Sequence, residues 1–296
     1  MGIDKIIYFH KVMYSKYLTP IDCIDGLYVK REDLFKPYEF SNANGSKLRQ
    51  CILLVEKNIN KAKGGIITGT SVVSPQSAIC SSVARGFGFP CTIMYGGTNE
   101  KSLEKHKYPM IAKQNGANII IGSKLGYTSA VQARASEYAK ENNMFEIKYG
   151  FDLMGNLDAF IESVANQVEN IPEVDNLVIT VGSAITLIGV LYGISIYNKN
   201  IKNVYAYAIA PNRLEKIQKY RDLIYFEQGV VLPIDRIRYI DYFAEVGYNY
   251  NQSIRESIGN IALHPKYEAK TYHWLKQNPL NGSTLFWIVG GDIEKK

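Results

Sequence analysis

Cysteine is scarce in this sequence, and its spacing carries no metal-binding pattern. The four cysteines are Cys23, Cys51, Cys80 and Cys91; no two form a CxxC pair and no histidine stands near them at a zinc-ligand spacing. The pattern therefore argues against a metal site. Buried or inert thiols in a reducing cytosol fit it better.

Other common signals are also missing. The first 17 residues show no clean apolar core or cleavage site, so we expect a cytoplasmic protein without a secretory signal. No GxGxxG or Walker loop occurs, which leaves a dinucleotide or nucleoside triphosphate site unsupported. There is no internal repeat and no low-complexity linker.

Charge is present in mild excess but is not concentrated. The net charge is +6, and the lysines and arginines are scattered along the chain. Such a charge is compatible with anionic ligands or nucleic acid and establishes neither. The densest cluster, "RLEKIQKYR" (213–221), repeats at helical spacing and predicts a solvated helix face.

One uncharged stretch, residues 176–198, is long enough to span a bilayer. Gly182 and Ser183 interrupt it after a β-branched run. A strand, a glycine turn and a buried helix explain that pattern better than a membrane helix. We expect no membrane span.

Short β-branched runs alternate with longer helical stretches. The strands are expected at 64–68, 91–97, 117–123, 145–150, 177–181, 204–210 and 283–291, and helices around 76–87, 99–115 and 127–142. This predicts an α/β fold with two open, twisted, mostly parallel sheets flanked by helices. Ligands would bind in a cleft at the carboxyl ends of the strands.

Two segments suggest chemistry. In "SNANGSKLRQ" (41–50), small residues surround Lys47 just before an apolar helix, an arrangement suited to receiving a bulky cofactor. A surface lysine capping a helix is the alternative. In "VGSAITLIG" (181–189), a glycine turn between strand and helix would direct backbone amides at an anion, although an ordinary tight turn has the same pattern.

Taken in order, six segments resemble motifs of one enzyme family. They are "TPIDCIDGLYVKREDLFKP", "NGSKLRQ" (family "GNKxRK"), "SAICSSVARGFGFPC", "VGSAITLIGVLYG" (family "GSGGTLAGLxxG"), "SIGNIALHPKYEAKTYHWL" (family "EGILLDPVYEGKAM") and "LFWIVGG" (family "LxxHxGG"). The chain thus resembles the pyridoxal 5'-phosphate (PLP) enzymes of the tryptophan synthase β-like fold, fold type II. Its nearest resemblance is to the 1-aminocyclopropane-1-carboxylate (ACC) deaminases and D-cysteine desulfhydrases.

The resemblance implies a domain division and a homodimer. Residues 1–47 and 150–296 would form a larger PLP-binding domain, and residues 48–149 a smaller α/β domain, with the PLP cleft between them.

The resemblance also implies roles for particular residues. Lys47 would be the Schiff-base lysine, and Glu268 would face the pyridine nitrogen and keep it protonated. Ser74 would contact the substrate, and Tyr248 and Tyr267 would assist acid–base steps, although a structural role for either tyrosine is as plausible. The remaining expected cofactor ligands are the segment Gly182, Ser183, Ala184, Ile185 and Thr186, which would hold the phosphate. For Glu268, the alternative is a surface position on a helix that starts at Pro265.

The sequence departs from the family pattern mainly on the substrate side. Pro75 replaces an asparagine expected to bond the cofactor's ring hydroxyl, and Gln76 is a candidate substitute. Ser46 and Gln50 replace an asparagine and a basic residue, and His264 replaces an aspartate. These changes point to an unusual substrate.

Three hypotheses follow. The first is a PLP-dependent lyase or deaminase of amino acid metabolism acting on an amino-acid-like small molecule. The second is a PLP-dependent decarboxylase or lyase whose amino acid group is attached to a nucleotide or a modified DNA base. The third is a non-catalytic PLP-binding scaffold, against which the retention of Lys47 and Glu268 argues.

Overall fold

The computed structural model describes residues 17–151, 157–211, 213–242, 244 and 252–294. The chain divides into two compact units, each with its own sheet. In the described part of the chain, unit 1 holds residues 36–151 and 293–294, and unit 2 holds residues 17–35 and 157–292. The domain division expected at residues 47 and 150 stays a prediction; here residues 36–47 group with unit 1.

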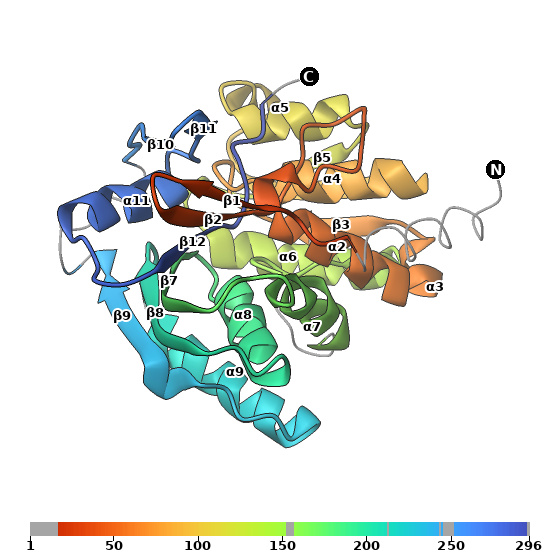
Figure 1. Ribbon diagram of the computed structural model, residues 1–296. Coiled ribbons are helices and arrows are strands. Elements are labelled where there is room, and N and C mark those ends of the chain that lie inside the picture. The colour runs from red at the N-terminus through yellow and green to blue at the C-terminus, as the bar shows by residue number, and fades with distance from the viewer. Residues whose placement is uncertain (1–16, 152–156, 212, 243, 245–251, 295–296) are drawn as a thin grey trace. The chain divides into compact units, whose positions relative to one another are not determined.

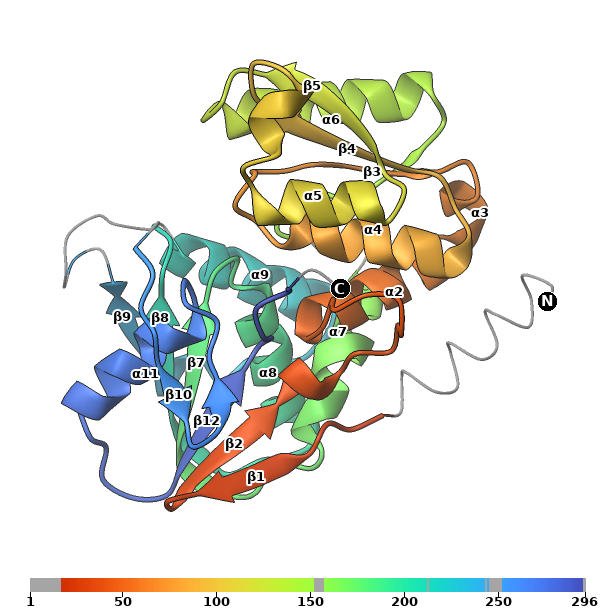
Figure 2. The ribbon, with the colours of Figure 1, turned by 90° about the horizontal axis from the view of Figure 1, so that it is seen from above.

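Unit 1 is a four-stranded, fully parallel sheet in the order β5-β4-β3-β6. Helix α6 packs on one face through Val131 and Ala135, and α4 and α5 lie on the other (Figure 2). Its elements are α2 (Ser46–Lys57), α3 (Ile59–Ala62), β3 (Ile66–Gly69), α4 (Gln76–Phe87), β4 (Cys91–Gly96), the 3-10 turn η2 (Glu100–Leu103), α5 (Lys107–Gln114), β5 (Asn118–Ser123), α6 (Thr128–Glu141) and β6 (Phe145–Glu146).

Unit 2 contains a six-stranded sheet in the order β1-β2-β12-β7-β8-β9, parallel except for the β1–β2 hairpin (Figure 1). Its elements are β1 (Ile21–Ile24), β2 (Leu27–Arg31), η1 (Glu32–Leu34), α7 (Leu157–Ala165), η3 (Asn166–Val168), β7 (Val174–Val181), α8 (Ile185–Ile196), β8 (Ile201–Ala208), α9 (Arg213–Gln228), η4 (Ile234–Arg236), β9 (Ile237–Asp241), β10 (Ser257–Ile258), β11 (Ile261–Ala262), α11 (Glu268–Gln277) and β12 (Thr284–Ile288). The predicted α/β class with mostly parallel sheets is confirmed.

The uncharged stretch 176–198 forms β7, a turn and α8, as predicted. Strand β7 and helix α8 are buried almost throughout, which explains why neither needs charged residues. In the described residues, no helix is both long and apolar enough to cross a membrane.

Two predicted elements differ from the structure. The strand expected at 145–150 pairs only over Phe145–Glu146, and the helix expected at 99–115 is split into η2 and α5. The Asn99 side chain accepts a hydrogen bond from Ser102 N at 3.0 Å, and this cap closes η2 as a separate short turn. The helix predicted at 213–221 is present as part of α9, whose residues are mostly exposed.

A buried polar network holds the end of β2 in unit 2. Lys30 Nζ donates to Thr19 O at 2.8 Å and to Asn170 Oδ1 at 2.7 Å. Thr19 Oγ1 donates to Glu32 Oε1 at 2.6 Å. The lysine and glutamate of the "KRED" segment are thus fully buried and structural in this protein.

Candidate active site

Lys47 is the second residue of α2 in unit 1. The helix begins after Gly45, whose φ of 88° lies in the left-handed region that favours glycine. Lys47 is half-buried, and its Nζ lies 5.8 Å from the centroid of the Phe151 ring. Partial burial and the positive end of the helix dipole both act against a charge at this position.

The loop between β3 and α4 contains the predicted substrate residue Ser74. Ser74 is buried, and its Oγ accepts a hydrogen bond from Gln76 N at 3.3 Å. Its own amide donates to Ser71 O at 3.1 Å, so residues 71–76 form a tight turn ahead of α4.

Gln76 is bonded within the protein through both ends of its amide. Its Nε2 donates to Thr68 Oγ1 at 2.7 Å and to Lys148 O at 3.0 Å, and its Oε1 accepts from Gly150 N at 2.7 Å. The side chain therefore holds the backbone next to Phe151, the residue over which Lys47 lies. A hydrogen bond donated by Gln76 to a cofactor, still a prediction, would have to replace one of the two Nε2 bonds, whereas Oε1 can accept a second bond.

Gln50 lies one turn beyond Lys47 and is almost completely buried. Neither its Oε1 nor its Nε2 has a hydrogen-bond partner in the described part of the chain. Leaving an amide unpaired in the interior is costly, so a ligand or a water is expected to bond to it. Sequence reasoning treated Gln50 as a lost charge and missed this neutral polar group.

The predicted phosphate turn lies in unit 2 between β7 and α8. Ala184 precedes the helix with φ 70°, no side chain caps the first turn, and no acidic residue lies in it. Gly182 and Ser183 are half-buried, while Ile185 and Thr186 are buried. The unpaired amides and the helix dipole make this helix start suitable for a phosphate.

Tyr267 lies beside this turn. A Cβ placed on Gly182 would be 3.9 Å from Tyr267 Cε1, with nothing nearer, so there is space next to Gly182. The Tyr267 ring meets the His264 ring edge to face, with centroids 4.5 Å apart. The structure thus brings the predicted residues Gly182 and Tyr267 together.

Glu268 is buried to 3% exposure, so its alternative position on a helix surface is wrong. Helix α11 begins at Glu268 itself, because Pro265–Tyr267 form a turn rather than the predicted first helical residues. Glu268 Oε1 accepts a hydrogen bond from Val289 N at 3.2 Å, while Oε2 has no partner among the described residues. Burial, reinforced by the nearby Asp33 charge, raises the pKa of Glu268 to about 8.

These residues fit PLP. Taken separately, Lys47 in unit 1 is a half-buried lysine of the kind that would bond an aldehyde, and the start of α8 in unit 2 has no capping side chain and would suit a phosphate. The unpaired, buried oxygen of Glu268 suits the pyridine nitrogen, which would bring the missing hydrogen bond.

Sequence reasoning also missed Lys270. It is buried, its Nζ lies 4.6 Å from the centroid of the Tyr242 ring, and burial, reinforced by Lys266, lowers its pKa to about 8. The sequence offered no pattern for it, because Glu268 and Lys270, two positions apart, do not share one face of a helix. Tyr248, predicted to be catalytic, lies outside the described residues.

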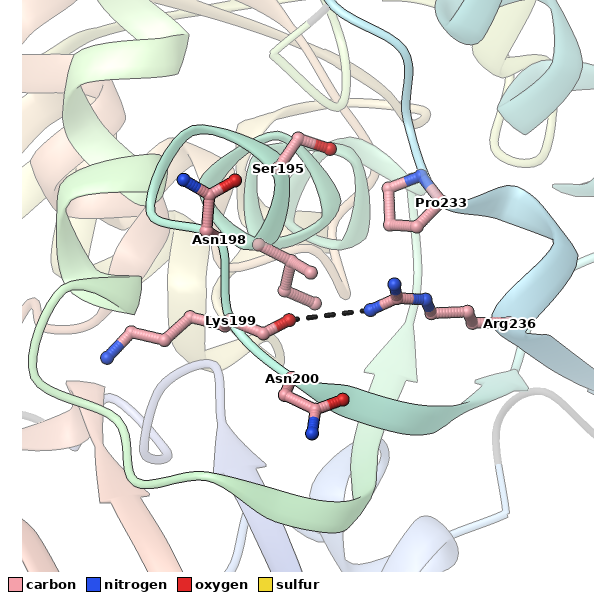
Figure 3. A pocket seen from close by; sticks show the side chains of 7 residues that line it. Ser195, Asn198, Lys199, Asn200, Pro233 and Arg236 are labelled. Atoms are coloured by element: carbon pink, nitrogen blue, oxygen red, sulfur yellow. Dashed lines mark hydrogen bonds between the residues drawn. The ribbon is translucent and has the colours of Figure 1, made fainter.

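A separate hollow of about 290 Å3 lies in unit 2 at the far end of α8 (Figure 3). Its two cations already have backbone partners: Arg236 Nη1 donates to Lys199 O at 3.4 Å and Ile201 O at 3.1 Å, and Lys199 Nζ donates to Ile171 O at 2.9 Å. Arg236 therefore joins the end of α8 to the start of β8, and the hollow has no sign of a reactive group.

No family model matches the chain. The O-seryl-dTMP PLP-dependent decarboxylase of Salmonella phage ViI is 30% identical over 89% of this chain and 78% of that protein. Among solved structures, an ACC deaminase homologue is 20% identical, with a TM-score of 0.76 over 98% of this chain and 95% of the other. Maize serine racemase is 15% identical, with a TM-score of 0.60 over 97% and 92%. At these identities the two structures establish the fold.

Proposed function

This chain belongs to the same family as the phage O-seryl-dTMP decarboxylase and is a PLP-dependent enzyme of fold type II, and on that basis we propose that it decarboxylates an amino acid attached to a nucleotide. The observation that carries the proposal is the 30% identity to that decarboxylase over most of both chains. It favours the second of the three sequence hypotheses over the first.

The chain's own residues have complementary tasks in this proposal. Lys47 binds the cofactor and moves a proton at the substrate's α-carbon, and the Gly182–Thr186 segment binds the phosphate. Glu268 shares a proton with the pyridine nitrogen, and the buried location of its carboxyl keeps that proton from water. When bound, PLP supplies an electron sink for the pair left on the α-carbon as CO2 departs.

Three unit 1 side chains close in sequence to this chemistry are neutral, although Arg49, beside Gln50, is a buried arginine. Ser74 and Gln76 are buried and uncharged, and Gln50 stands where the family has a basic residue. Ser74 would orient the substrate carboxylate by a hydrogen bond without neutralising it by an ion pair.

The test uses PLP-loaded enzyme and a serine joined through its side-chain oxygen to thymidine monophosphate, which leaves the α-carboxylate free to depart as CO2. We expect CO2 release and a product lighter by one CO2, measured by mass spectrometry, with neither in Lys47→Ala. Exposed Lys57→Ala, on the same helix, is the matched control and should leave the rate unchanged. Equal turnover of free serine would contradict a nucleotide-linked substrate.

A lyase or deaminase acting on a small amino acid is the second candidate. It is supported by Lys47, Ser74 and Glu268, which match the deaminase pattern together. Release of ammonia from ACC or D-cysteine without CO2 would support this second candidate. If none of these substrates is turned over, the result would support the non-catalytic scaffold. We also propose that the protein is cytoplasmic and forms a homodimer. Sedimentation of the PLP-loaded enzyme would test the homodimer.

A further inference from the structure

A second hollow lies in unit 1 at the carboxyl ends of its parallel strands. It has a volume of about 50 Å3 and is bordered by residues 70–72 after β3, Gly96 at the end of β4, and residues 125–128 between β5 and α6. Figure 2 shows β3, β4, β5 and α6 adjoining in this unit. None of the residues that line this hollow has a role in the proposed function so far.

The floor of this hollow contains an unsatisfied polar group. Thr70 is 1% exposed, and its Oγ1 has no hydrogen-bond partner among the residues that the structure describes. Its amide, in contrast, donates to Met94 O at 3.0 Å. A buried hydroxyl without a partner indicates a place where a ligand's polar edge belongs.

The rim is apolar and aromatic. Leu125 and Tyr127 are 61% and 62% exposed and flank Gly126, whose φ of 90° makes the turn between them. Two large, exposed hydrophobic side chains this close together indicate a surface that contacts a ligand. The tyrosine ring offers a face on which a nucleobase stacks.

Helix α6 begins at the same rim. Tyr127 precedes it, no side chain caps its first turn, and no acidic residue lies there. Lys124, exposed just before Leu125, forms no ion pair within the described chain. The helix start and this lysine together favour an anionic group next to the aromatic surface.

From these features we infer that this hollow binds the nucleotide part of the substrate, with the base on Tyr127, one polar edge on Thr70 and the phosphate at the start of α6. A hollow of about 50 Å3 admits a ring edge and not a whole nucleoside, which agrees with a base lying mostly on the exposed rim. The same loop leads from Thr70 to Ser74, so one short segment serves both ends of the substrate. The inference rests on the proposed nucleotide-linked substrate.

The test measures binding of dTMP, inorganic phosphate and a short oligothymidylate to the PLP-loaded enzyme by calorimetry. Tyr127→Ala should weaken dTMP binding about tenfold or more, and Tyr127→Phe, which keeps the ring, by less than about threefold. Thr70→Val should weaken it by roughly fivefold without changing the shape of the buried side chain. Tyr225→Ala, a similarly exposed tyrosine on α9, is the control and should bind as wild type does.

Unchanged dTMP binding in Tyr127→Ala, or phosphate alone binding as tightly as dTMP, would overturn the inference. Tighter binding of oligothymidylate than of dTMP, still dependent on Tyr127, would support it and identify the nucleotide as part of DNA.

Turnover separates this inference from the proposed function. If Tyr127→Ala releases CO2 with an unchanged KM, the function stands and the subsite fails. If dTMP binding depends on Tyr127 but no CO2 is released, the subsite stands and the reaction fails. A raised KM with little change in kcat supports both.

Discussion

Two helices in this protein start just after a buried parallel strand, and they start in opposite ways. Before α8 in unit 2, the chain passes through Gly182 and a left-handed Ala184 and leaves the first amides without a side-chain cap. Before α4 in unit 1, Ser74 accepts a bond from Gln76 N, and the Gln76 side chain is tied to the backbone on both sides. We call the first start open, because no side chain bonds its amides, and the second closed, because Ser74 already bonds the Gln76 amide and the Gln76 side chain fixes the adjoining backbone.

The difference shows why departures from the family pattern are tolerated unevenly. A phosphate site at the start of α8 requires the left-handed backbone conformation, which Ala184 adopts with a φ of 70°. Alanine can therefore stand where the family has glycine. The start in unit 1 depends on particular side chains, and there Pro75 replaces the family's asparagine, with Gln76 one position on as a candidate substitute. Under the proposed function, the substrate-side residues of unit 1 can therefore change while the phosphate turn of unit 2 stays the same.

The largest expected effect concerns Glu268, the carboxyl group proposed to face the pyridine nitrogen of the cofactor. Its pKa rises from 4.5 to about 8 on folding, so the folded state keeps a proton that the unfolded chain has lost. Stability of the cofactor-free protein should therefore fall between about pH 5 and pH 8, by on the order of 4–5 kcal/mol. Urea unfolding across this pH range measures it.

Glu268→Gln should remove most of this pH dependence, whereas Glu227→Gln, an exposed carboxylate of α9, should leave it in place. A pH profile equally steep in wild type and Glu268→Gln would show that Glu268 is not the buried acid responsible. Lys270 acts in another window: its lowered pKa makes stability rise from about pH 8 toward 10.5.

The closed start of α4 should be sensitive to Gln76→Ala. The change removes three hydrogen bonds and leaves Gly150 N without its acceptor, a loss of about 2–4 kcal/mol in the free energy of unfolding. Denaturant unfolding at neutral pH measures this, with exposed Gln114→Ala on α5 as the control. If both variants unfold alike, the start of α4 is not held by Gln76.

The open start of α8 should be sensitive in ligand affinity rather than in stability. Thr186→Val removes a hydroxyl expected to bond the phosphate and should weaken PLP binding about five- to tenfold. The control is Thr271→Val on α11. It removes a different buried hydroxyl, the one that bonds Thr180 on β7. Titration of cofactor-free protein with PLP gives both affinities, and equal affinities would place the phosphate elsewhere.

The smallest effect concerns the backbone conformation at two alanines, Ala184 before α8 and Ala78 inside α4. Ala184→Gly should stabilise the cofactor-free protein by about 0.5–1 kcal/mol, because glycine adopts the left-handed conformation without strain. Ala78→Gly, inside α4, should destabilise it by about 1 kcal/mol. Thermal unfolding of both proteins checks the opposite signs, and the same sign in both would contradict the comparison.

The backbone layout could be predicted because local sequence carries it. β-branched runs followed by Gly182 or by the small residues near Thr70 mark strand ends, and these strands are where the patterns place them. The surroundings of Glu268 could not be predicted, because the Val289 amide that bonds it and the Asp33 charge that helps raise its pKa lie elsewhere in the sequence. The same holds for Gln76, because two of its three side-chain partners, Lys148 and Gly150, lie more than seventy residues along the chain.

The strand order of unit 2 has a consequence for synthesis of the protein. Strand β12 lies between β2 and β7, pairing Thr284 with Leu27 on one side and Asn176 on the other. During translation β2 and β7 therefore expose unpaired edges until residues 284–288 emerge, whereas the sheet of unit 1 is complete by Glu146. Unit 1 is expected to fold first, and a ribosome stalled before β12 should release a chain that needs chaperones to escape aggregation.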